Sequence, residues 1–559
     1  MRRLAKRARE SAAAFREVVA NPGLRNLELA WAFAIIGHWA YTIAVSVYAY
    51  EAGGASAVGL VFALRLGAAA VVAPFAGMLA DRYRRDLILL GSSLVRIVLM
   101  GAAAVCVFAD APPAAVYALA VAAAVATAPF RSTQAALTPS LTTSPAQLTA
   151  ANAIASTIES LAIFVGPALA GLLMALTSTG VVFAINAGML ALTALFVLRI
   201  HAPPVTKKPE LEAATIVSES LAGFRVIGGD PPLRTLIALL SAQTLLLGAL
   251  EVYIVVLAFE VLDQGAAGVG LLNSIMGIGA LVGGIAALSL TGSRHLSVPV
   301  AIGAVLVGAP LALIGAWPES VLIPLLLAVV AVGSTVLDVA GFTLVQRVVS
   351  DDVMARVFGV VQMLFYITLA VGAAVAPGLV DWLDIRGALV ATGASLVVLV
   401  ALLWTRLARI DARAQAPDQS SFRLLTSIPI FALLPGASLE HLAARLVPLQ
   451  LDPGTVIVRE GEEGDRFYIV ADGTVDVTRD GQRASRLEAG DHFGEIALIR
   501  QSPRTATVTA ATPVVLYALD RDDFLAAVTS HAPSAEAAED VVSSRLAGVP
   551  VAGARLPAG

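Results

Sequence analysis

Charge is scarce in this sequence: only 14% of its 559 residues are Asp, Glu, Lys or Arg, while 58% are hydrophobic. Soluble domains of ordinary composition carry about a quarter charged residues, so a wholly soluble globular protein is excluded. The deficit lies between Asn26 and Trp404, where long apolar stretches follow one another, and charge returns to ordinary levels after Asp411. The chain therefore divides into a part adapted to a lipid bilayer and a part adapted to water.

Other absences narrow the function. The single cysteine, Cys106, excludes an intrachain disulfide, and a net charge of −4 without a basic patch argues against a nucleic-acid partner. The ATP-binding pattern G-x-x-x-x-G-K-[ST] does not occur, and no set of nucleophile and base or cluster of metal ligands is present. We therefore expect no enzyme, no catalytic residue and no metal site.

Twelve apolar stretches are each close to the 20 residues that cross a bilayer as a helix. The first is long enough to be an uncleaved span rather than a signal peptide. The pattern predicts a mainly α membrane protein. The predicted spans are Leu27–Tyr48, Ala57–Leu79, Leu87–Ala109, Ala114–Ala136, Ala150–Leu176, Val181–Leu198, Leu233–Leu257, Gly268–Leu290, Val298–Ala316, Val321–Val345, Val357–Leu383 and Gly387–Trp404.

Basic residues mark one side of the predicted membrane part. Alternate connections between the spans hold nearly all of the Lys and Arg, and the opposite connections are acidic, with Arg386 as the one exception. Because Lys and Arg stay on the cytoplasmic side, we expect both termini there, in a plasma or inner membrane. The basic residues are Arg82, Arg84, Arg85, Lys207, Lys208, Arg225, Arg294, Arg347 and Arg356; the acidic ones opposite are Glu51, Asp110, Glu260, Asp263 and Glu319.

The two halves of the membrane part repeat each other. Segment 15–27 recurs as segment 224–236, Val58-Gly59-Leu60 recurs as Val269-Gly270-Leu271, and Pro167 recurs as Pro377, always 209 to 211 residues later. Two six-helix halves repeated in parallel are typical of a rocking transporter with its substrate cavity between the halves. Duplication within a membrane protein that does not transport is the alternative.

One connection carries a family motif. Residues 77–85, Gly-Met-Leu-Ala-Asp-Arg-Tyr-Arg-Arg, resemble the loop motif G-x-L-A-D-R-x-G-R of the major facilitator superfamily, with Arg84 in place of glycine. The resemblance implies that Gly77, Asp81, Arg82 and Arg85 form a latch between conformations. Simple anchoring of the arginines on the basic side is the alternative, and it does not explain Asp81.

A second motif lies in the fifth predicted span. Gly166-Pro167-Ala168-Leu169-Ala170-Gly171 resembles the G-P-x-x-G-G segment of proton-driven exporters. The resemblance implies export in exchange for protons. Pro167 and its counterpart Pro377 each predict a helix kink, which a packing role without transport function explains equally well.

Ionisable residues inside apolar spans are costly and are therefore candidates for function. Carboxyl groups there can carry a proton, and arginines can hold an anionic substrate or balance the carboxylates. Internal structural ion pairs, such as Arg96 with Glu159, are the alternative. The candidates for transport and proton coupling are His38, Arg65, Arg96, Glu159, Glu251 and Asp338.

The part after Asp411 has the pattern of a small soluble domain. A polar linker precedes two short helices within Phe422–Leu446, and a further helix is predicted over Arg521–Thr529. Asp472-Gly473 and Asp480-Gly481 predict hairpin turns. Together these features predict a helix-flanked antiparallel β-roll. Its strands are expected at Thr455–Val458, Phe467–Val470, Thr474–Val477, Ala506–Thr509 and Val514–Ala518.

Residues 490–508 resemble the phosphate-binding cassette of cyclic-nucleotide-binding domains, F-G-E-x-A-L followed by P-R-[AST]-A. The resemblance extends over the whole soluble domain and implies cAMP or cGMP as a regulatory ligand. A degenerate domain kept for protein contacts is the alternative. The binding residues that it implies are Phe493, Gly494, Glu495, Ile496, Ala497, Arg504, Thr505 and Ala506.

The chemistry of these residue types suits such a ligand. Gly494 allows the backbone to approach the phosphate, and Arg504 can donate charge-assisted hydrogen bonds to its oxygens. Glu495 can accept a hydrogen bond from the ribose 2′-hydroxyl. The resemblance implies that the hydroxyl of Thr505 can help to accept guanine. Both cAMP and cGMP therefore remain candidate ligands.

These observations predict a major facilitator domain over residues 1–410, with halves at about 1–200 and 224–410 joined by a cytoplasmic loop at 201–223. A linker at 411–421, a cyclic-nucleotide-binding domain at 422–535 and a C-terminal helix and tail at 536–559 follow. The predicted function is secondary transport, proton-coupled and outward, regulated by cytosolic cyclic nucleotide. A membrane-anchored nucleotide sensor that moves no solute is the rival hypothesis. The substrate and the oligomeric state stay open.

Overall fold

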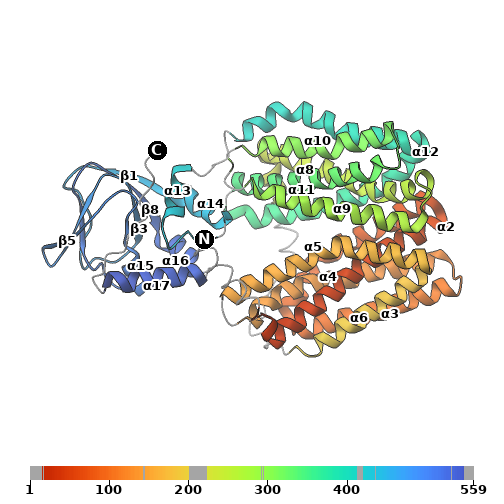
Figure 1. The fold of residues 1–559 in the computed structure, drawn as a ribbon, viewed down its shortest axis with the longest axis horizontal. Helices are drawn as coiled ribbons and strands as arrows, with labels where there is room; N and C mark the ends of the chain where they lie inside the picture. The colour runs from red at the N-terminus through yellow and green to blue at the C-terminus, as the bar shows by residue number, and fades with distance from the viewer. Residues whose placement is uncertain are drawn as a thin grey trace. The chain divides into compact units, whose positions relative to one another are not determined.

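The chain folds as two units, an all-helical one and a helix-flanked β-roll (Figure 1). The computed structural model describes residues 16, 18–142, 145–200, 223–290, 293, 295–349, 351–411, 419–432, 434, 436–529 and 532–546. Residues 201–222 of the predicted loop and most of the linker 411–421 lie outside these residues, as do residues 547–559 of the predicted tail.

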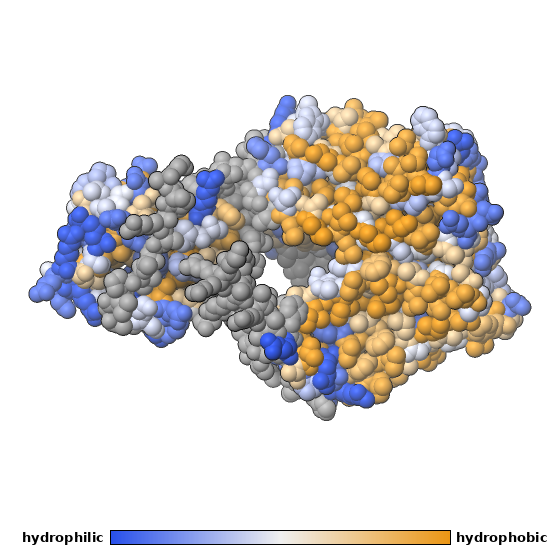
Figure 2. All heavy atoms as spheres, viewed as in Figure 1, coloured by the Kyte–Doolittle hydropathy of each residue, from blue (hydrophilic) through white to orange (hydrophobic). Residues whose placement is uncertain are grey.

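Ten helices of the described part of the chain are long and apolar enough to cross a membrane. Apolar side chains dominate the surface of this unit in Figure 2, as expected for helices that face lipid. The helices are α2 (Pro22–Arg82), α3 (Arg85–Phe108), α4 (Pro113–Leu141), α5 (Pro145–Leu176), α6 (Thr179–Val197), α8 (Pro231–Val256) with a π-helical turn η1 (Leu257–Val261), α9 (Gly265–Leu288), α10 (Ser297–Ala316), α11 (Leu322–Val348) and α12 (Asp351–Asp411).

Two of these helices each contain two predicted spans. Both α2 and α12 have 61 residues, which as one straight helix is about 90 Å, roughly three times the hydrocarbon thickness. The helical backbone breaks at Gly53 and Gly54 in α2 and at Asp384 in α12, where φ is +54°. Counting the two parts of each broken helix separately, the prediction of twelve spans in two six-helix halves is confirmed.

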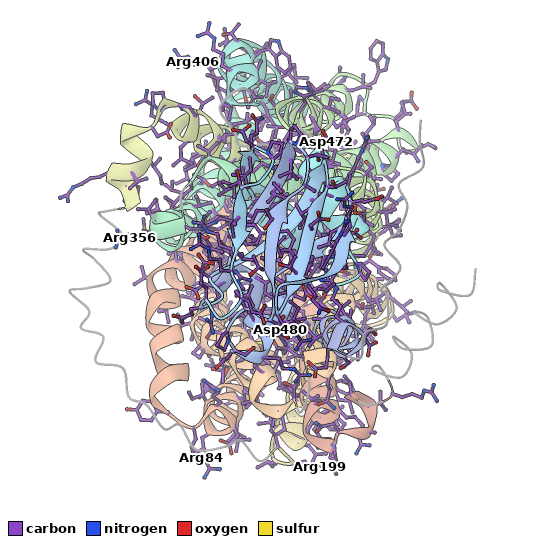
Figure 3. All side chains as sticks on the ribbon, turned by 90° about the vertical axis from the view of Figure 1, so that its left-hand side faces the viewer. Arg84, Arg199, Arg356, Arg406, Asp472 and Asp480 are labelled. Atoms are coloured by element: carbon purple, nitrogen blue, oxygen red, sulfur yellow. The ribbon has the colours of Figure 1, made fainter. Side chains whose placement is uncertain are left out.

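Arginines gather at one end of the helices. Arg84, Arg199, Arg356 and Arg406 all lie close to helix ends on the side where the chain enters α2, and Figure 3 shows their side chains projecting outward. This distribution agrees with the alternation of basic residues in the sequence. Three of the predicted basic residues, Lys207, Lys208 and Arg294, lie outside the described residues.

Arg386, the exception in the sequence, caps a helix at the opposite end. Its Nε donates to the carbonyl of Gly315 at 3.3 Å and its Nη2 to that of Ala316 at 3.2 Å. These are the last carbonyls of α10, which have no partner within the helix and carry partial negative charge. A local capping role therefore explains this arginine.

The repeat seen in the sequence recurs in the packing of the two halves. A Cβ at Gly59 would lie 2.7 Å from Pro377 Cγ, and a Cβ at Gly270 would lie 2.6 Å from the Pro167 carbonyl oxygen. Each half therefore places a glycine against a proline that lies inside a helix of the other half. Only glycine allows such a close approach between membrane helices.

A polar contact joins the two halves beyond these glycines. The hydroxyl of Tyr50, near the break in α2, donates to Glu260 Oε1 at 2.6 Å. The Tyr50 ring also lies 4.6 Å from that of Phe259 in η1. The halves thus contact each other toward the end that is remote from the arginine-rich side.

The β-roll contains two four-stranded antiparallel sheets, with strand orders β1-β8-β3-β6 and β2-β7-β4-β5. Helices α13 (Gln419–Ser427), α14 (Gly436–Arg445), α16 (Arg521–Thr529) and α17 (Ala532–Leu546) flank it, and α15 (Glu495–Arg500) follows β6. The strands are β1 (Val447–Leu451), β2 (Val456–Val458), β3 (Arg466–Asp472), β4 (Val475–Arg479), β5 (Gln482–Leu487), β6 (His492–Phe493), β7 (Thr507–Ala510) and β8 (Val514–Asp520).

One of the two predicted hairpins is wrong. Asp480 and Gly481 both have positive φ and join the paired strands β4 and β5, as predicted. Asp472 and Gly473, in contrast, join β3 to β4, which belong to different sheets. This turn carries the chain from one sheet of the roll to the other, and it lies at the opposite tip of the roll from Asp480 (Figure 3).

An aromatic cluster holds the helices on the roll. The rings of Phe467 in β3 and Phe524 in α16 stack at 4.8 Å, and Phe431 meets Phe467 edge-on at 5.4 Å. All three side chains are fully buried. The strand that carries Phe467 is therefore fixed on its helix-facing side, and Arg466 and Tyr468 next to it belong to the site described below.

Candidate functional site

Gly494 forms the turn between β6 and α15. Its φ is +99°, a left-handed conformation that side chains rarely adopt. A Cβ there would lie 2.7 Å from Arg504 Nη1 and 2.8 Å from the carbonyl oxygen of Arg466. Glycine is therefore required both by the backbone conformation and by the close approach of the Arg504 guanidinium.

Arg504 is held in place below this turn. It is 5% exposed, and its guanidinium donates to the carbonyls of Gly494 (3.2 Å) and Arg466 (2.8 Å) and to Asp465 Oδ1 (3.2 Å). Its own backbone N–H donates to the carbonyl of Glu462 at 2.7 Å. A fixed guanidinium beside a glycine turn can donate charge-assisted hydrogen bonds to an anion.

Glu495 has one carboxylate oxygen in use and one free. The residue is 0% exposed, and its Oε1 accepts a hydrogen bond from Arg545 Nη1 at 2.7 Å. Its Oε2 is buried and has no partner. Because an unmade hydrogen bond at a buried oxygen is costly, this atom is suited to accept from a ligand hydroxyl.

The other predicted cassette residues form the surroundings of these groups. Phe493 and Ala497 are buried, and the Phe493 ring stacks on Tyr468 at 5.0 Å. Ile496, Thr505 and Ala506 are half-buried. The structure thus places the Arg504 guanidinium against Gly494, which Glu495 follows directly in the chain.

His492 adds a buried titratable group to this region. It is 5% exposed, and its Nε2 has no partner. Burial, followed by the positive charge of Arg545, lowers the pKa of His492 to about 3. The ring is therefore neutral at physiological pH.

In the membrane unit, the predicted ionisable residues differ in their surroundings. Arg65 and Arg96 are both buried, and Arg65 donates to Thr42 Oγ1 at 3.3 Å while its Nε and Nη1 lack partners. His38 lies within electrostatic reach of both arginines. All three residues belong to the first half, and the two arginines give its interior a basic character.

The predicted carboxyls fall into two groups. Glu159 forms an ion pair with Arg131 at 2.8 Å, so the interpretation that paired it with Arg96 is wrong. Arg131 lies in α4, opposite Glu159 in α5, whereas Arg96 lies over the ring of Phe130 at 6.0 Å. Glu251 and Asp338, in the second half, form no ion pair with any of the residues that the structure describes. Glu251 lies within electrostatic reach of Arg65.

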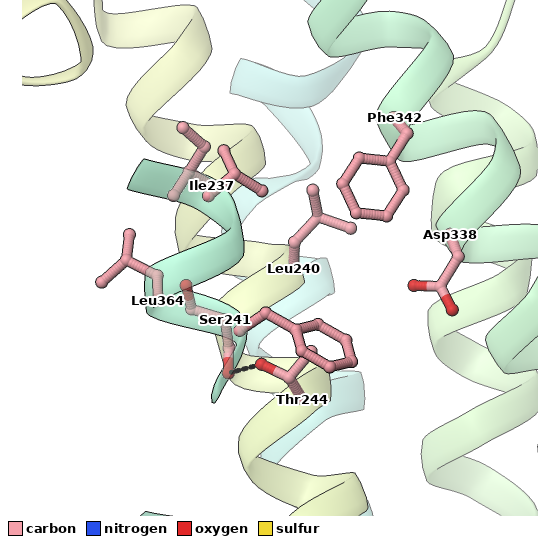
Figure 4. A pocket seen from close by; sticks show the side chains of 9 residues that line it. Ile237, Leu240, Ser241, Thr244, Asp338, Phe342 and Leu364 are labelled. Atoms are coloured by element: carbon pink, nitrogen blue, oxygen red, sulfur yellow. Dashed lines mark hydrogen bonds between the residues drawn. The ribbon is translucent and has the colours of Figure 1, made fainter. Parts of the chain in front are cut away.

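Asp338 lines a pocket between three helices (Figure 4). Leu240, Ser241 and Thr244 come from α8, Phe342 comes from α11 together with Asp338, and further apolar side chains come from α12. The cavity is small, about 10 Å³, which is room for a single water molecule.

Comparison with known families identifies the family of each unit. Residues 28–372, more than half of the chain, match the Major Facilitator Superfamily. The chain belongs to that superfamily. Residues 448–531 match the cyclic nucleotide-binding domain, so this member of the Major Facilitator Superfamily carries a fused nucleotide-binding domain.

Similar proteins are found separately for the two units. The soluble unit is 40% identical over 102 residues to a cAMP-dependent protein kinase regulatory subunit of Yarrowia lipolytica, covering 18% of this chain and 27% of that protein. It is 36% identical over 130 residues to a cyclic nucleotide-gated potassium channel of Rhizobium etli, covering 23% and 36%. The chain thus spans about a third or less of the length of these curated relatives.

The fold of the membrane unit resembles that of a solved POT family transporter in complex with a thioalcohol conjugated peptide. The match has a TM-score of 0.56 and 13% identity, and it covers 69% of this chain and 96% of the other. At this identity the likeness supports the fold alone. It agrees with the Major Facilitator Superfamily fold expected from the twelve spans.

The structure describes only part of the first family motif of the membrane unit, residues 77–85. The side chains of Gly77, Asp81 and Arg82 lie outside the described residues, so the predicted latch stays a prediction. Arg84 has φ −57°, which any residue adopts, and it pairs with Asp86 at 2.7 Å. The turn therefore does not need the glycine that the motif usually has there.

The structure describes all of the second family motif, residues 166–171. Pro167 lies inside α5 and Pro377 inside α12. A Cβ at Gly166 would lie 2.5 Å from Trp39 Cβ, so α5 packs very closely on α2. This contact is compatible with both interpretations of the motif, a transport function and simple packing.

Sequence reasoning missed four polar residues of these regions. Arg131 and Arg545 are ion-pair partners of Glu159 and Glu495, and Asp465 holds Arg504. Glu28, in the first span of α2, is 5% exposed and has no partner for either carboxylate oxygen. Arg131 and Glu28 lie within predicted spans and were detectable there; Arg545 and Asp465 carry no pattern in the sequence.

Proposed function

We propose that this member of the Major Facilitator Superfamily is a secondary active transporter whose activity is set by cytosolic cAMP or cGMP. The cassette offers the two groups that such a ligand needs. Arg504 is a fixed cation for the cyclic phosphate, and Glu495 is an acceptor for the ribose 2′-hydroxyl. The two relatives are named as cAMP-dependent and cyclic nucleotide-gated proteins, which supports a ligand of this class.

The observation that carries the regulatory part is the double role of Glu495. One of its oxygens is bonded to Arg545 on α17, and the other is free for the ligand. A hydroxyl that binds Glu495 changes the charge distribution of the same carboxylate that holds α17. Ligand binding and the position of the C-terminal helix are therefore linked, and a coupling of about 1–3 kcal/mol is enough for a several-fold effect.

The transport part of the proposal assigns proton coupling to the unpaired carboxyls. Glu251 and Asp338 are the carboxyl groups of the predicted set for which no ion pair is described, whereas Glu159 is bound to Arg131. A carboxyl without a fixed counter-charge can take up and release a proton during the cycle. The resemblance of Gly166-Pro167 and its neighbours to exporter motifs supports the outward direction, with both termini in the cytoplasm.

Nucleotide binding is tested with the full-length protein in nanodiscs, titrated calorimetrically with cAMP and cGMP. We expect saturable binding of at least one nucleotide and its loss in Arg504→Ala. Arg483→Ala is the matched control, because this arginine of β5 is 53% exposed and pairs with Asp476 instead of a cassette residue. Unchanged binding in Arg504→Ala would contradict the assignment of the site.

Regulation and transport are tested separately. Spin labels on the two halves report the distance between them with and without saturating nucleotide, and reconstituted vesicles report proton flux driven by candidate substrates. A nucleotide-dependent distance together with flux supports the regulated transporter. A nucleotide-dependent distance without flux for any substrate would favour the rival hypothesis of a sensor, and flux that ignores nucleotide would remove the regulation.

A further inference from the structure

Glu28 is a buried carboxyl that has no role in the proposed function. It lies in the second turn of α2 and is 5% exposed. Both of its carboxylate oxygens are buried, and neither has a hydrogen-bond partner among the residues that the structure describes. The other unpaired carboxyls of the membrane unit are less isolated, because Asp338 has a hydrogen bond with Gln243 and Glu251 is only half-buried. A buried polar group without partners calls for an explanation.

The side chain of Glu28 faces the packed interior of the first half. Leu24 and Trp31, four residues before it and three after it, lie on the same face of α2 and are buried. The Trp31 indole donates to the carbonyl of Ala155 in α5 at 3.4 Å. Its ring stacks on that of Phe130 in α4, with 6.3 Å between the centroids. Glu28 is therefore enclosed where α2 packs against α4 and α5.

No basic side chain balances this carboxyl. Within the part of the chain that the structure describes, no charged group lies within electrostatic reach of Glu28. Helices α4 and α5 carry one charged residue each, Arg131 and Glu159, and these two pair with each other. Arg25, the nearest cation along α2, is exposed and donates to the carbonyl of Val19. A negative charge on Glu28 would therefore have no counter-ion.

Two species could neutralise such a group, a metal cation or a proton. A metal cation needs several oxygen or nitrogen ligands, and the described residues contain no group of three or more His, Cys, Asp or Glu side chains that could hold one. A buried carboxylate without a counter-ion or a hydrogen-bond donor is costly, and in practice it is neutralised by binding a proton. The surroundings of Glu28 therefore favour the protonated carboxyl.

We propose that Glu28 is a proton-binding site and that it is uncharged in the conformation of this structure. It follows the start of α2 by six residues, about 9 Å, and so lies near the arginine-rich end of the helices. In the proposed orientation this end is cytoplasmic, so a proton that leaves Glu28 when α2 moves away from α5 enters the cytosol. Only the part of Glu28 in proton coupling rests on the proposed transport function; the bound proton does not.

Infrared spectroscopy tests the bound proton directly, because a protonated carboxyl has a C=O stretching band that a carboxylate lacks. At pH 7 exposed carboxyls are ionised, so this band reports buried protonated groups. The full-length protein is measured in dodecyl maltoside, a detergent without carbonyl groups, and the spectrum of Glu28→Gln is subtracted from that of the wild type. We expect a carboxylic acid band in this difference. A difference spectrum without this band would overturn the proposal.

Two further variants make the assignment specific. Glu28→Asp should shift the band without abolishing it, since the acid is kept and its position changes, and this variant remains informative if Glu28→Gln does not fold. Glu319→Gln is the matched control, because Glu319 is exposed in the connection between α10 and α11 and is ionised at pH 7. Its difference spectrum should contain no carboxylic acid band. A band that keeps its position in Glu28→Asp, or that disappears in Glu319→Gln, would contradict the assignment to Glu28.

Flux measurements separate the proton site from its part in transport. In reconstituted vesicles, Glu28→Gln should lose the proton flux that candidate substrates drive, and Glu319→Gln should keep it. If Glu28→Gln loses the infrared band and keeps the flux, the proton site is confirmed and its part in coupling is contradicted. If the wild type has the band and no substrate drives proton flux, the proton site is confirmed and the proposed transport function is contradicted.

Discussion

Glu495 and Arg545 form an ion pair of 2.7 Å between the short helix α15 and the last described helix, α17. The Glu495 side chain is 1% exposed, and Arg545 is its partner in this ion pair. A second pair, Arg500 with Glu539, joins the same two helices at the surface. The C-terminal helix is therefore attached to the candidate nucleotide site through the residue that we expect to bind the ribose.

Arg545→Ala should destabilise the soluble unit by about 3 kcal/mol, because it leaves the Glu495 carboxylate buried without its countercharge. Arg500→Ala is the control: both members of its pair are nearly half exposed, so its loss should cost less than about 1 kcal/mol. Denaturant unfolding of a fragment of residues 419–559 measures both. Equal losses of unfolding free energy in the two variants would show that the buried Glu495–Arg545 pair stabilises the unit no more than the exposed pair does.

Arg504→Lys should abolish high-affinity nucleotide binding although the charge is kept. A lysine ammonium cannot reproduce the fork that reaches the carbonyls of Gly494 and Arg466 while holding the cation in place. We expect at least about a tenfold loss of affinity in calorimetry. Arg486→Lys in β5 serves as control, since this arginine pairs with Asp476. Wild-type affinity in Arg504→Lys would mean that charge alone suffices.

Acid should destabilise the β-roll through His492. Its folded pKa of about 3 lies below the ordinary value of 6.5, so the unfolded state binds the proton more tightly. Its contribution to stability is fully present above pH 6.5 and is lost as the pH falls toward 3, by about 1.4 kcal/mol per pH unit. Unfolding free energies of fragment 419–559 and of its His492→Phe variant, compared from pH 7 to pH 4, measure this difference. Parallel pH profiles would contradict the prediction.

Hydropathy was sufficient to predict the membrane fold. Each span must be near 20 apolar residues because the bilayer has a fixed thickness, so twelve spans followed from the sequence. The breaks also had a local signal: Gly53 and Gly54 separate the first two spans, and Gly54 has φ +64°. The hydropathy pattern does not predict which helices of one half contact which helices of the other.

The same limit applies to the sites. Gly494, Glu495 and Arg504 lie within eleven positions of one another, and their backbone conformations bring them together, so a local motif could predict them. Arg545 lies 50 residues beyond Glu495, and its role depends on how α17 packs on α15. Likewise, Arg131 and Arg96 were equal candidates as partners of Glu159 until the packing of α4 and α5 was known.

Gly59→Val should separate the two halves. A Cβ at this position would lie 2.5 Å from the Ala373 carbonyl oxygen, which the backbone of α12 cannot relieve without moving. The contact between the halves should open, and double electron–electron resonance between labels on the two halves measures the shift to longer distances. Gly67→Val, in the same helix, is the control because no atom lies within 4 Å of its Cβ position. Equal distances in both variants would contradict the proposed contact.

Glu251→Gln and Glu159→Gln should separate proton coupling from structure. Glu251 has no described ion-pair partner, so its neutral variant should abolish proton flux driven by substrate while the protein stays folded. Glu159 forms an ion pair with Arg131, and the Arg131 side chain is 68% exposed. The Glu159→Gln variant should therefore keep proton coupling and lose less than about 1 kcal/mol of stability. Proton flux in vesicles, measured with a pH-sensitive dye inside, distinguishes the two. If Glu159→Gln stopped the flux and Glu251→Gln did not, the proton would travel through the paired carboxyl, and burial without a partner would be the wrong criterion for this protein.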